Sequence, residues 1–328
     1  MRDNGKNGGI MEKVKVNLIY MPQGNDASAP RYENEFGELW MNGTRKEGMH
    51  NISMSFYSAN YPDPIKAGDS IYVIEPMCVS ERDYEIEFIE KFKYIFTWAD
   101  NAFKNTTVKD KIISLNHPSC LGVDKQGFEN RKHGWAKWSD RRDEITFIAN
   151  NKSSNHHSEL YSRRIILAQW LHNNSEKYKV SWYAQGSMPS NYFKGTIHGD
   201  KSTVLNHVKF SICTENCYSE KYSTNYFTEK MPEVWFSGAV PIYMGCYNID
   251  QFGFHPDSYI DLRKFTDGKN IKLRELLNEI NTFDENKYNK YLEAVDYNIN
   301  QANLFNIISE ERAMGKMIET FYKEKNGI

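Results

Sequence analysis

The sequence predicts an α/β protein of two domains, each built on a largely parallel sheet. Three observations lead to this prediction. The chain has 328 residues, which is more than one domain usually contains. Short apolar runs typical of buried strands alternate with stretches of helical spacing. The alternation occurs on both sides of a polar, tryptophan-bearing stretch at residues 122–143, which we interpret as the crossing between the domains.

The first domain is predicted at residues 11–140, behind a polar, Gly/Asn-rich leader at residues 1–10 that we expect to be disordered. A helix is predicted at Glu81–Phe92, where isoleucine and aromatic residues recur mostly at helical spacing. Apolar runs predict four strands, at Val14–Tyr20, Ile71–Ile74, Tyr94–Trp98 and Ile112–Leu115.

The second domain is predicted at residues 141–284, and residues 285–328 are predicted to form C-terminal helices. The last of these, Ile307–Tyr322, is expected to pack back across the cleft between the domains. Within the second domain the same patterns predict strands at Ile145–Ala149, Val180–Tyr183, residues 208–213, before Gly245 and near residues 259–260, and helices at Ser158–His172 and Ile271–Asn281.

Charge and cysteine usage exclude several classes of protein. A formal net charge of -2 gives no attraction of the whole molecule for nucleic acid or an anionic membrane. No run approaches the roughly 18 apolar residues that cross a bilayer, so we expect a soluble, cytosolic protein. Five scattered cysteines fit reduced thiols better than a disulfide framework. Cys213 and Cys217 lack a second pair of ligands, so no zinc site is expected.

Residues 208–245 have the order of an anion site. An apolar strand is followed by a polar turn, the triplet Thr228-Glu229-Lys230, a helix and a second apolar strand. Open α/β sheets bind ligands at the carboxyl ends of their strands. A helix beginning near Thr228 would add free N–H groups and a positive dipole end there. The dipole disfavours Lys230 in the first turn unless an anion is shared, and a phosphate would satisfy both.

At these residues the chain resembles glycosyltransferase family 10, the α1,3/α1,4-fucosyltransferases. The hallmark of that family is an apolar strand, Phe-Glu-Asn, a short loop, Tyr-x-Thr-Glu-Lys, a helix and Val/Ile-Pro-x-x-x-Gly. The loop between Asn216 and Tyr226 is longer than usual for the family, and Thr214 stands where Phe is common. The matching elements read Thr214-Glu215-Asn216, Tyr226-Phe227-Thr228-Glu229-Lys230 and Val240-Pro241-Ile242-Tyr243-Met244-Gly245.

The resemblance implies a GT-B fold, in which two Rossmann-like domains face one another across a cleft. It also implies an inverting fucosyltransferase that moves L-fucose from GDP-β-L-fucose to a glycan hydroxyl, forming an α linkage by single displacement. Animal members carry a membrane anchor, a stem and disulfides. This chain therefore resembles the soluble bacterial or viral type, which implies the cytosol of a bacterium or of a virus-infected host cell.

The sequence contains no Asp-x-Asp pair, so protein cations are expected to neutralise the diphosphate, with no essential divalent metal and no cofactor besides the donor. Lys230 is one such cation. The family carries an arginine on the helix after the strand at Ile145–Ala149, and its spacing selects Arg164, with Arg163 as the next choice. Both would make forked contacts with phosphate. The alternative is that the two arginines form a solvated helix face.

The resemblance also assigns the rest of the donor site. Glu229 is similar to the carboxylate that accepts hydrogen bonds from the nucleotide ribose, although a glutamate there could also only complement the helix dipole. Tyr226 would stack on or hydrogen-bond the nucleotide. Asn216 would contact the donor from the end of its strand.

Glu75 is the predicted catalytic base. The family has a glutamate after a strand of the first domain, and Glu75 follows the strand at Ile71–Ile74. A carboxylate there, with its pKa raised by partial burial, could take the proton of the acceptor hydroxyl. The alternatives are Glu81 as the base, and a structural Glu75 that caps the following turn.

Two other functions remain open on the sequence. The longer loop after Asn216 could accompany a different nucleotide-sugar donor, and the chain could be a catalytically silent glycan-binding protein of the same fold. A nicotinamide-dependent dehydrogenase is disfavoured because no Gly-x-Gly-x-x-Gly follows a predicted strand.

Overall fold

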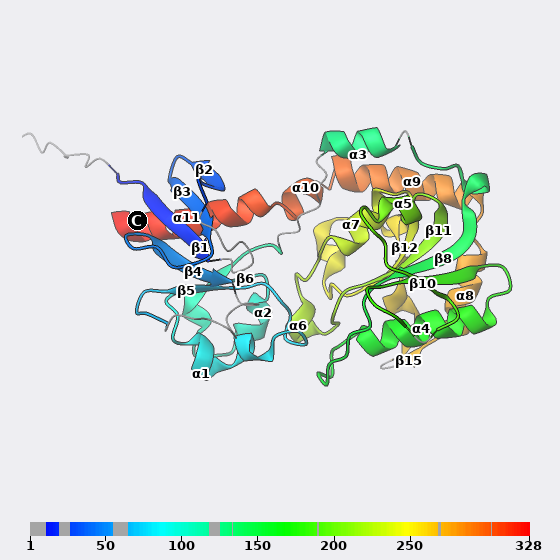
Figure 1. Cartoon of the computed structure of the whole chain (residues 1–328), viewed down its shortest axis with the longest axis horizontal. Helices are drawn as coiled ribbons and strands as arrows, with labels where there is room; N and C mark the ends of the chain where they lie inside the picture. Colours follow the sequence, from blue (N-terminus) through cyan, green and yellow to red (C-terminus); the bar gives the residue numbers. More distant parts are fainter. Residues whose placement is uncertain are drawn as a thin grey trace, which may run out of the picture. The chain divides into compact units, whose positions relative to one another are not determined.

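The computed structural model describes residues 11–19, 27–54, 65–117, 125–132, 134–188, 190–267, 270–302 and 304–328. The expected leader at residues 1–10 and parts of the expected crossing lie outside these residues. The chain divides into two compact units (Figure 1). The N-terminal unit comprises Met1–Glu75, Arg82–Leu115 and Glu310–Ile328, and the C-terminal unit comprises Pro76–Glu81 and Asn116–Ser309.

A seven-stranded sheet forms the N-terminal unit, in the order β2-β3-β1-β4-β5-β6-β7. β2 pairs antiparallel with β3, and the other pairs are parallel. The strands predicted from apolar runs are present, whereas β2, β3 and β4 were not predicted because their sequences mix polar and apolar residues. The strands are β1 (Val14–Ile19), β2 (Tyr32–Asn34), β3 (Gly37–Asn42), β4 (His50–Met54), β5 (Ser70–Val73), β6 (Ile95–Thr97) and β7 (Ile112–Ser114).

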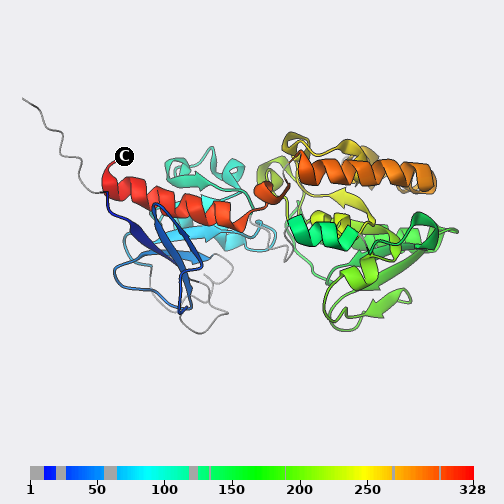
Figure 2. The same cartoon turned by 90° about the horizontal axis from the view of Figure 1, so that it is seen from above.

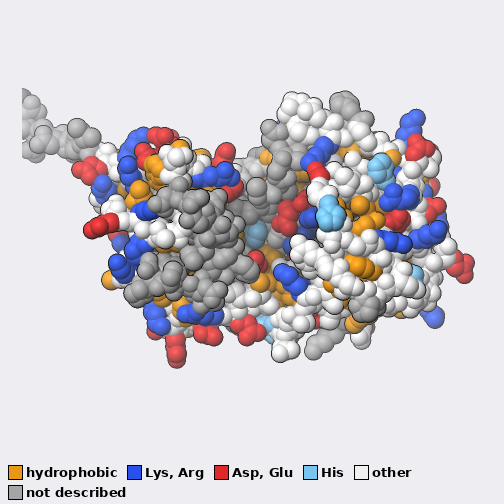
Figure 3. Space-filling view, viewed as in Figure 1, with side chains coloured by type: hydrophobic (Ala, Val, Ile, Leu, Met, Phe, Trp, Pro, Cys, Tyr) orange, Lys and Arg blue, Asp and Glu red, His pale blue; other side chains and the backbone are white. Residues whose placement is uncertain are grey.

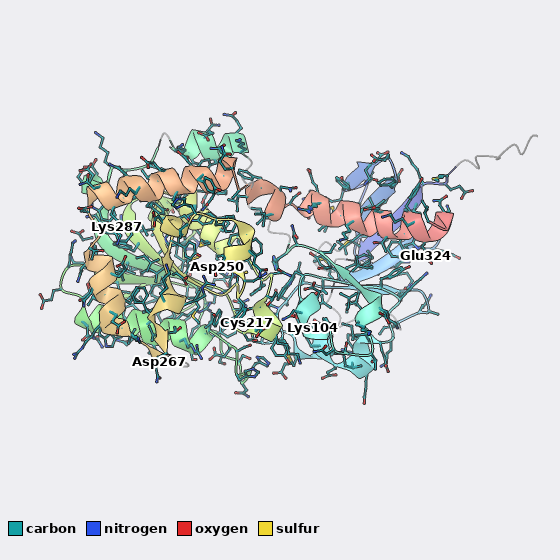
Figure 4. All side chains as sticks on the ribbon, turned by 180° about the vertical axis from the view of Figure 1, so that it is seen from behind. Lys104, Cys217, Asp250, Asp267, Lys287 and Glu324 are labelled. Atoms are coloured by element: carbon teal, nitrogen blue, oxygen red, sulfur yellow. The ribbon has the colours of Figure 1, made fainter. Side chains whose placement is uncertain are left out.

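The last helix, α11 (Glu310–Asn326), packs on β1, β2 and β3 of this sheet (Figure 2). Its buried residues Met314, Met317, Ile318 and Phe321 join the core of the N-terminal unit. Near its end Glu324 pairs with Lys93 and accepts a hydrogen bond from the Tyr94 hydroxyl at 3.1 Å (Figure 4). The segment 285–328 is therefore divided between the two units, because α9 (Glu285–Asn300) and α10 (Leu304–Ile307) belong to the C-terminal one.

The predicted helix at Glu81–Phe92 is wrong. The structure has a 3-10 turn, η3 (Glu81–Tyr84), and a single α-helical turn, α1 (Ile86–Ile89). Glu85 between them has extended backbone angles, φ -73° and ψ 120°. The break lets Asp83 and Tyr84 be buried from one turn, and Phe88 and Ile89 from the next. The apolar residues serve two separate short turns, which a count of helical spacing cannot distinguish from one helix.

A six-stranded parallel sheet forms the C-terminal unit, in the order β10-β9-β8-β11-β12-β13. Counted from β8, this is the 3-2-1-4-5-6 order of doubly wound nucleotide-binding sheets, and its order reverses between β8 and β11. β10 was not predicted, and α3 (Lys125–Lys132) lies in the expected crossing. The strands are β8 (Arg142–Ile148), β9 (Lys179–Tyr183), β10 (Phe193–Gly195), β11 (Val208–Thr214), β12 (Val240–Met244) and β13 (Ile260–Asp261).

Helices cover both faces of this sheet, and α4 and α9 lie on opposite sides of the strands in Figure 1. α4 packs on β9, β11 and the neighbouring α8, whereas α5 and α7 pack on β11 from the other side. Every residue of β11 and β12 is buried, as expected for central strands of a covered parallel sheet. The helices are α4 (Tyr161–Asn174), α5 (Ser202–Leu205), α7 (Lys230–Trp235) and α8 (Leu273–Asn281).

Candidate functional site

The candidate site lies where the strand order of the C-terminal sheet reverses, at the carboxyl ends of β8 and β11. The loop before α4 is joined there to the loop after β11 by backbone hydrogen bonds. The Leu160 N–H donates to the Asn216 carbonyl at 2.9 Å, and the Tyr218 N–H donates to the Ser158 carbonyl at 2.8 Å. These bonds bring the first turn of α4, which carries Arg164, beside Asn216. Ligands of such sheets bind at this crevice.

Glu215, the residue after β11, is fully buried and accepts hydrogen bonds from four donors. They are the Thr228 N–H at 2.9 Å, the Thr228 hydroxyl at 2.7 Å, the Lys230 Nζ atom at 2.9 Å and the Tyr243 hydroxyl at 3.4 Å. The chain thus supplies from its own Glu215 the anion that Lys230 needs in the first turn of α7. Sequence reasoning placed Glu215 at the sheet edge but missed this role, which depends on side chains that meet only in the folded protein.

Gly245, the last residue of the family motif, is explained by Glu215. A β-carbon at Gly245 would lie 2.2 Å from Cγ of Glu215 and 2.3 Å from its Cβ, so no other residue fits there without moving the Glu215 side chain. The glycine after β12 therefore keeps the buried carboxylate in place on β11.

Gly245→Ala is expected to destabilise the protein by about 1–3 kcal/mol, the usual cost of overpacking a core, and to weaken nucleotide binding by displacing Glu215. Thermal unfolding and a GDP titration measure the two effects. Gly315→Ala on α11 is the matched control, since the nearest atom to its added methyl is 3.4 Å away. Equal stability of the two variants would contradict the packing role of Gly245.

Lys230 is held between carboxylates and keeps part of its side chain, 25%, exposed. Its Nζ atom lies 3.0 Å from the Thr228 hydroxyl and 3.8 Å from Oε1 of Glu229. Burial lowers the pKa of Lys230, but Glu215 and Glu229 raise it by more, so the amine stays charged at neutral pH. Burial likewise raises the pKa of Glu229, but Lys230 and the Glu229 backbone N–H lower it by more, so this carboxyl stays ionised.

Arg164 is a buried cation. Its side chain is 4% exposed, Nη2 donates to the Asn150 carbonyl at 3.0 Å, and the guanidinium lies 4.8 Å from the Tyr161 ring centroid. Within the described part of the chain, Nε of Arg164 has no hydrogen-bond partner and no carboxylate lies within ion-pair distance. Burial lowers the pKa of Arg164. Burying a charge without a counter-charge has a high free-energy cost. The position of Arg164 therefore indicates a binding site for an anion. Arg163 is only half-buried.

Tyr226 and Asn216 complete the group. The Asn216 amide donates to the Tyr226 hydroxyl at 3.0 Å, and Tyr226 is 2% exposed. The His117 ring meets the Tyr226 ring edge-on at 5.4 Å, and a protonated His117 would lower the pKa of Glu229. The structure thus gathers the predicted residues 164, 216, 226, 229 and 230 in one unit. His117 was missed because nothing in its sequence surroundings distinguishes it.

Glu75 lies in the N-terminal unit, two residues after β5 ends at Val73. The backbone here is fixed by two side chains. The Trp98 indole N–H donates to the Ile74 carbonyl at 2.7 Å, and the Tyr84 hydroxyl donates to the Glu75 carbonyl at 3.0 Å. The chain passes into the C-terminal unit directly afterwards, at Pro76. Glu75 is thus the last residue of the segment Met1–Glu75, and the segment Pro76–Glu81 of the C-terminal unit follows it directly.

Surface charge on the face drawn in Figure 3 does not indicate a second binding site. Basic and acidic side chains are interspersed over both units on the face drawn in Figure 3. In the described ranges, no group of three His, Cys, Asp or Glu side chains is placed to hold a metal ion. No helix among these residues is long and apolar enough to span a bilayer.

Two units, each built on a largely parallel sheet, with the doubly wound strand order in the C-terminal one, are the architecture of the GT-B class. Residues 138–325 match the model of glycosyltransferase family 10 (fucosyltransferase), C-terminal part. This match covers more than half of the chain. The protein therefore belongs to glycosyltransferase family 10, the fucosyltransferases, and is a glycosyltransferase.

A solved structure supports this fold, and others resemble the chain at lower TM-scores. A crystal structure of an α1,3-fucosyltransferase is similar over 95% of this chain and 90% of its own, at 12% identity and a TM-score of 0.53. An α1,3-fucosyltransferase with GDP matches over 96% and 92%, at 13% identity and a TM-score of 0.47. A trehalose 6-phosphate synthase from Burkholderia multivorans matches over 97% and 99%, at 7% identity and a TM-score of 0.48.

Proposed function

We propose that the protein transfers L-fucose from GDP-β-L-fucose to a hydroxyl of a glycan. The acceptor oxygen attacks C1 of fucose from the face opposite GDP, and the bond from C1 to the phosphate oxygen breaks. GDP leaves with the electron pair, the acceptor proton passes to a base, and the β linkage of the donor becomes an α linkage. The observation that supports this most is Arg164, a buried cation at the ligand edge of the sheet that has no carboxylate at ion-pair distance among the described residues.

Lys230 and Arg164 are proposed to bind the diphosphate and to stabilise the charge that develops as GDP leaves. Arg163 would add a second contact from the same turn of α4. Glu229, ionised and partly exposed, would accept hydrogen bonds from the ribose hydroxyls. Asn216 and Tyr226 would bind the donor as one hydrogen-bonded pair. Because these cations come from the chain, we expect no essential divalent ion and no further cofactor.

Glu75 is proposed as the base. Chain connectivity supports it. The Sγ atom of Cys78 lies 3.4 Å from the Asn216 carbonyl in the C-terminal unit. Three residues of chain span at most about 11 Å, so Glu75 cannot lie further than that from Cys78, measured between Cα atoms. The hydrogen bonds to the Ile74 and Glu75 carbonyls would hold the backbone that carries the Glu75 carboxylate in one position.

The proposal further assigns acceptor recognition to the N-terminal domain and donor binding to the C-terminal domain. It takes the enzyme to be the soluble bacterial or viral type, active in the cytosol. Free, buried thiols at Cys78, Cys213, Cys217 and Cys246 support a reducing compartment.

A different nucleotide-sugar donor is the second candidate. The observation in its favour is α6 (Glu220–Ser223), a helical turn in the longer loop between Asn216 and Tyr226. Titrations with GDP-fucose, GDP-mannose and UDP-sugars separate the two candidates. Binding of GDP-fucose in preference to the others supports the first, and preference for another donor supports the second.

Arg164→Met is expected to weaken GDP binding by about 10- to 150-fold, the worth of a lost charge-assisted hydrogen bond. It should not lower stability, because it removes a buried charge that has no counter-charge before the nucleotide arrives. Calorimetric titration of GDP and thermal unfolding measure both quantities. Arg274→Met, an exposed arginine on α8, is the control. Unchanged GDP affinity in Arg164→Met would count against the donor site.

A further inference from the structure

The longer loop after Asn216 contains a helical turn and is hydrogen-bonded to the residues that follow β12. Its turn α6 is capped by Ser219, whose hydroxyl accepts from the Tyr222 N–H at 3.1 Å. The Tyr247 N–H, beyond β12, donates to the Ser223 carbonyl at 3.1 Å. The Asn225 N–H donates to Oδ1 of Asn248 at 2.8 Å. The loop therefore has a defined position over the ends of β11 and β12.

This arrangement brings two tyrosines together at the ligand edge of the sheet. The rings of Tyr218, from the loop after β11, and Tyr247, from the loop after β12, have centroids 5.6 Å apart and an interplanar angle of 36°. Tyr247 is 39% exposed and is one of few large apolar side chains in the described ranges with so much exposed surface. Exposed aromatic groups concentrate where ligands or partners bind.

Arg263 and two carboxylates lie around the tyrosine pair. Arg263 donates to Asp250 at 2.8 Å and to Asp261 at 2.8 Å, so these three side chains carry a net charge of one negative unit. Arg263 also donates to the Tyr247 carbonyl at 3.2 Å, which fixes the backbone under that ring. Asp250 is 74% exposed, and Figure 4 marks it and Cys217, the residue before Tyr218.

Because two carboxylates hold Arg263, its charge is not available to a phosphate, and the surroundings of the pair suit an uncharged ligand rich in hydroxyls. The Asp250 carboxylate and the exposed Gln251 amide are hydrogen-bonding groups of the kind that bind hydroxyls. An aromatic surface with a few polar groups at its rim is the general form of a small-molecule site. A pyranose ring has an apolar face and hydroxyls at its edge, and therefore matches both parts.

We propose that Tyr218 and Tyr247 form a platform that binds an uncharged sugar ring of the acceptor glycan. The inference rests on the proposed function, because it takes the bound glycan to be the acceptor. The C-terminal domain then takes part in acceptor recognition, through a loop in which this chain is longer than is usual for its family.

Glycan binding by the whole protein, saturated with GDP, tests the platform. The probes are N-acetyllactosamine, lactose and maltotriose, titrated with detection by saturation-transfer NMR. The wild type is expected to bind at least one of them. Tyr218→Ala and Tyr247→Ala are each expected to weaken that binding about tenfold or more, as for a buried aromatic anchor. GDP affinity, measured by calorimetry, should stay within about twofold in both variants.

Tyr297→Ala is the matched control, because Tyr297 on α9 is 43% exposed and lies outside the platform. Three outcomes would overturn the inference: no probe binds the wild type, the two variants bind glycan as the wild type does, or GDP affinity falls in place of glycan affinity, which would make the platform a nucleotide-base site. Failure of the proposed function is a separate result, in which GDP does not bind the wild type. The glycan titrations without GDP then still test the platform.

Discussion

Glu75→Gln is expected to lower the rate of fucose transfer by a factor of about 10²–10⁴ while leaving GDP affinity nearly unchanged. Glutamine keeps the shape of the side chain but cannot take the proton of the attacking hydroxyl. The residue lies outside the donor cluster, so nucleotide binding has no reason to change. Initial rates of GDP release from GDP-fucose, with N-acetyllactosamine as the probe acceptor, measure the first effect, and a GDP titration measures the second.

Two further variants separate the alternatives for the base. Glu81→Gln changes the other candidate for the base, the last residue of the segment Pro76–Glu81 in the C-terminal unit. Glu85→Gln is a control that changes an exposed glutamate between η3 and α1. Both are expected to keep the wild-type rate. A loss of rate in Glu81→Gln together with an active Glu75→Gln would transfer the role of base to Glu81.

Lys230→Met is expected to have the largest combined effect, on stability and on donor binding. The variant leaves the fully buried Glu215 without its cation. Removing one partner of a buried ion pair costs about 3–5 kcal/mol, and the partial exposure of Lys230 favours the lower end of that range. GDP affinity should also fall by about 10- to 150-fold through the lost charge-assisted contact. Urea unfolding and calorimetry give the two numbers.

The double variant Lys230→Met/Glu215→Gln distinguishes the two effects. With the buried carboxylate replaced by a neutral amide, most of the lost stability should return, whereas GDP affinity should stay low. Lys290→Met, an exposed lysine on α9, is the surface control for lysine removal. If the double variant were as unstable as Lys230→Met, the ion pair would not be the cause of the instability.

The C-terminal fold could be predicted to a large extent because its strands are buried on both faces. β12 reads as a continuous apolar run, which is typical of a covered parallel strand, and β11 has the apolar residues Val208, Phe210 and Ile212 at alternate positions. The strands of the N-terminal sheet were harder to predict from the sequence. β2 and β3 carry residues that are half-buried or exposed, so their sequences lack a clear period. Local patterns also missed the break at Glu85, which depends on what Tyr84 and Phe88 each pack against.

The candidate site was predictable where it depends on a contiguous motif. The sequence indicated that Lys230 in a first turn needs an anion, and the structure supplies one in Glu215. That contact joins residues fifteen positions apart, and only the fold brings them together. Arg164 could be selected by its place on a helix, but its burial and missing counter-charge could not be read from the sequence. The roles of Glu75, Arg163, Arg164, Asn216, Tyr226, Glu229 and Lys230 remain predictions.

Calorimetric titration of the wild type with GDP in EDTA tests the central claim most directly, with GDP-fucose, UDP and NAD as parallel ligands. A ligand that binds the folded state also raises its thermal stability, which provides an independent readout. Cations supplied by the chain predict binding of GDP and GDP-fucose without metal, and no comparable binding of UDP or NAD. Absence of GDP binding, or binding that needs a divalent ion, would contradict a donor site built on Arg164 and Lys230.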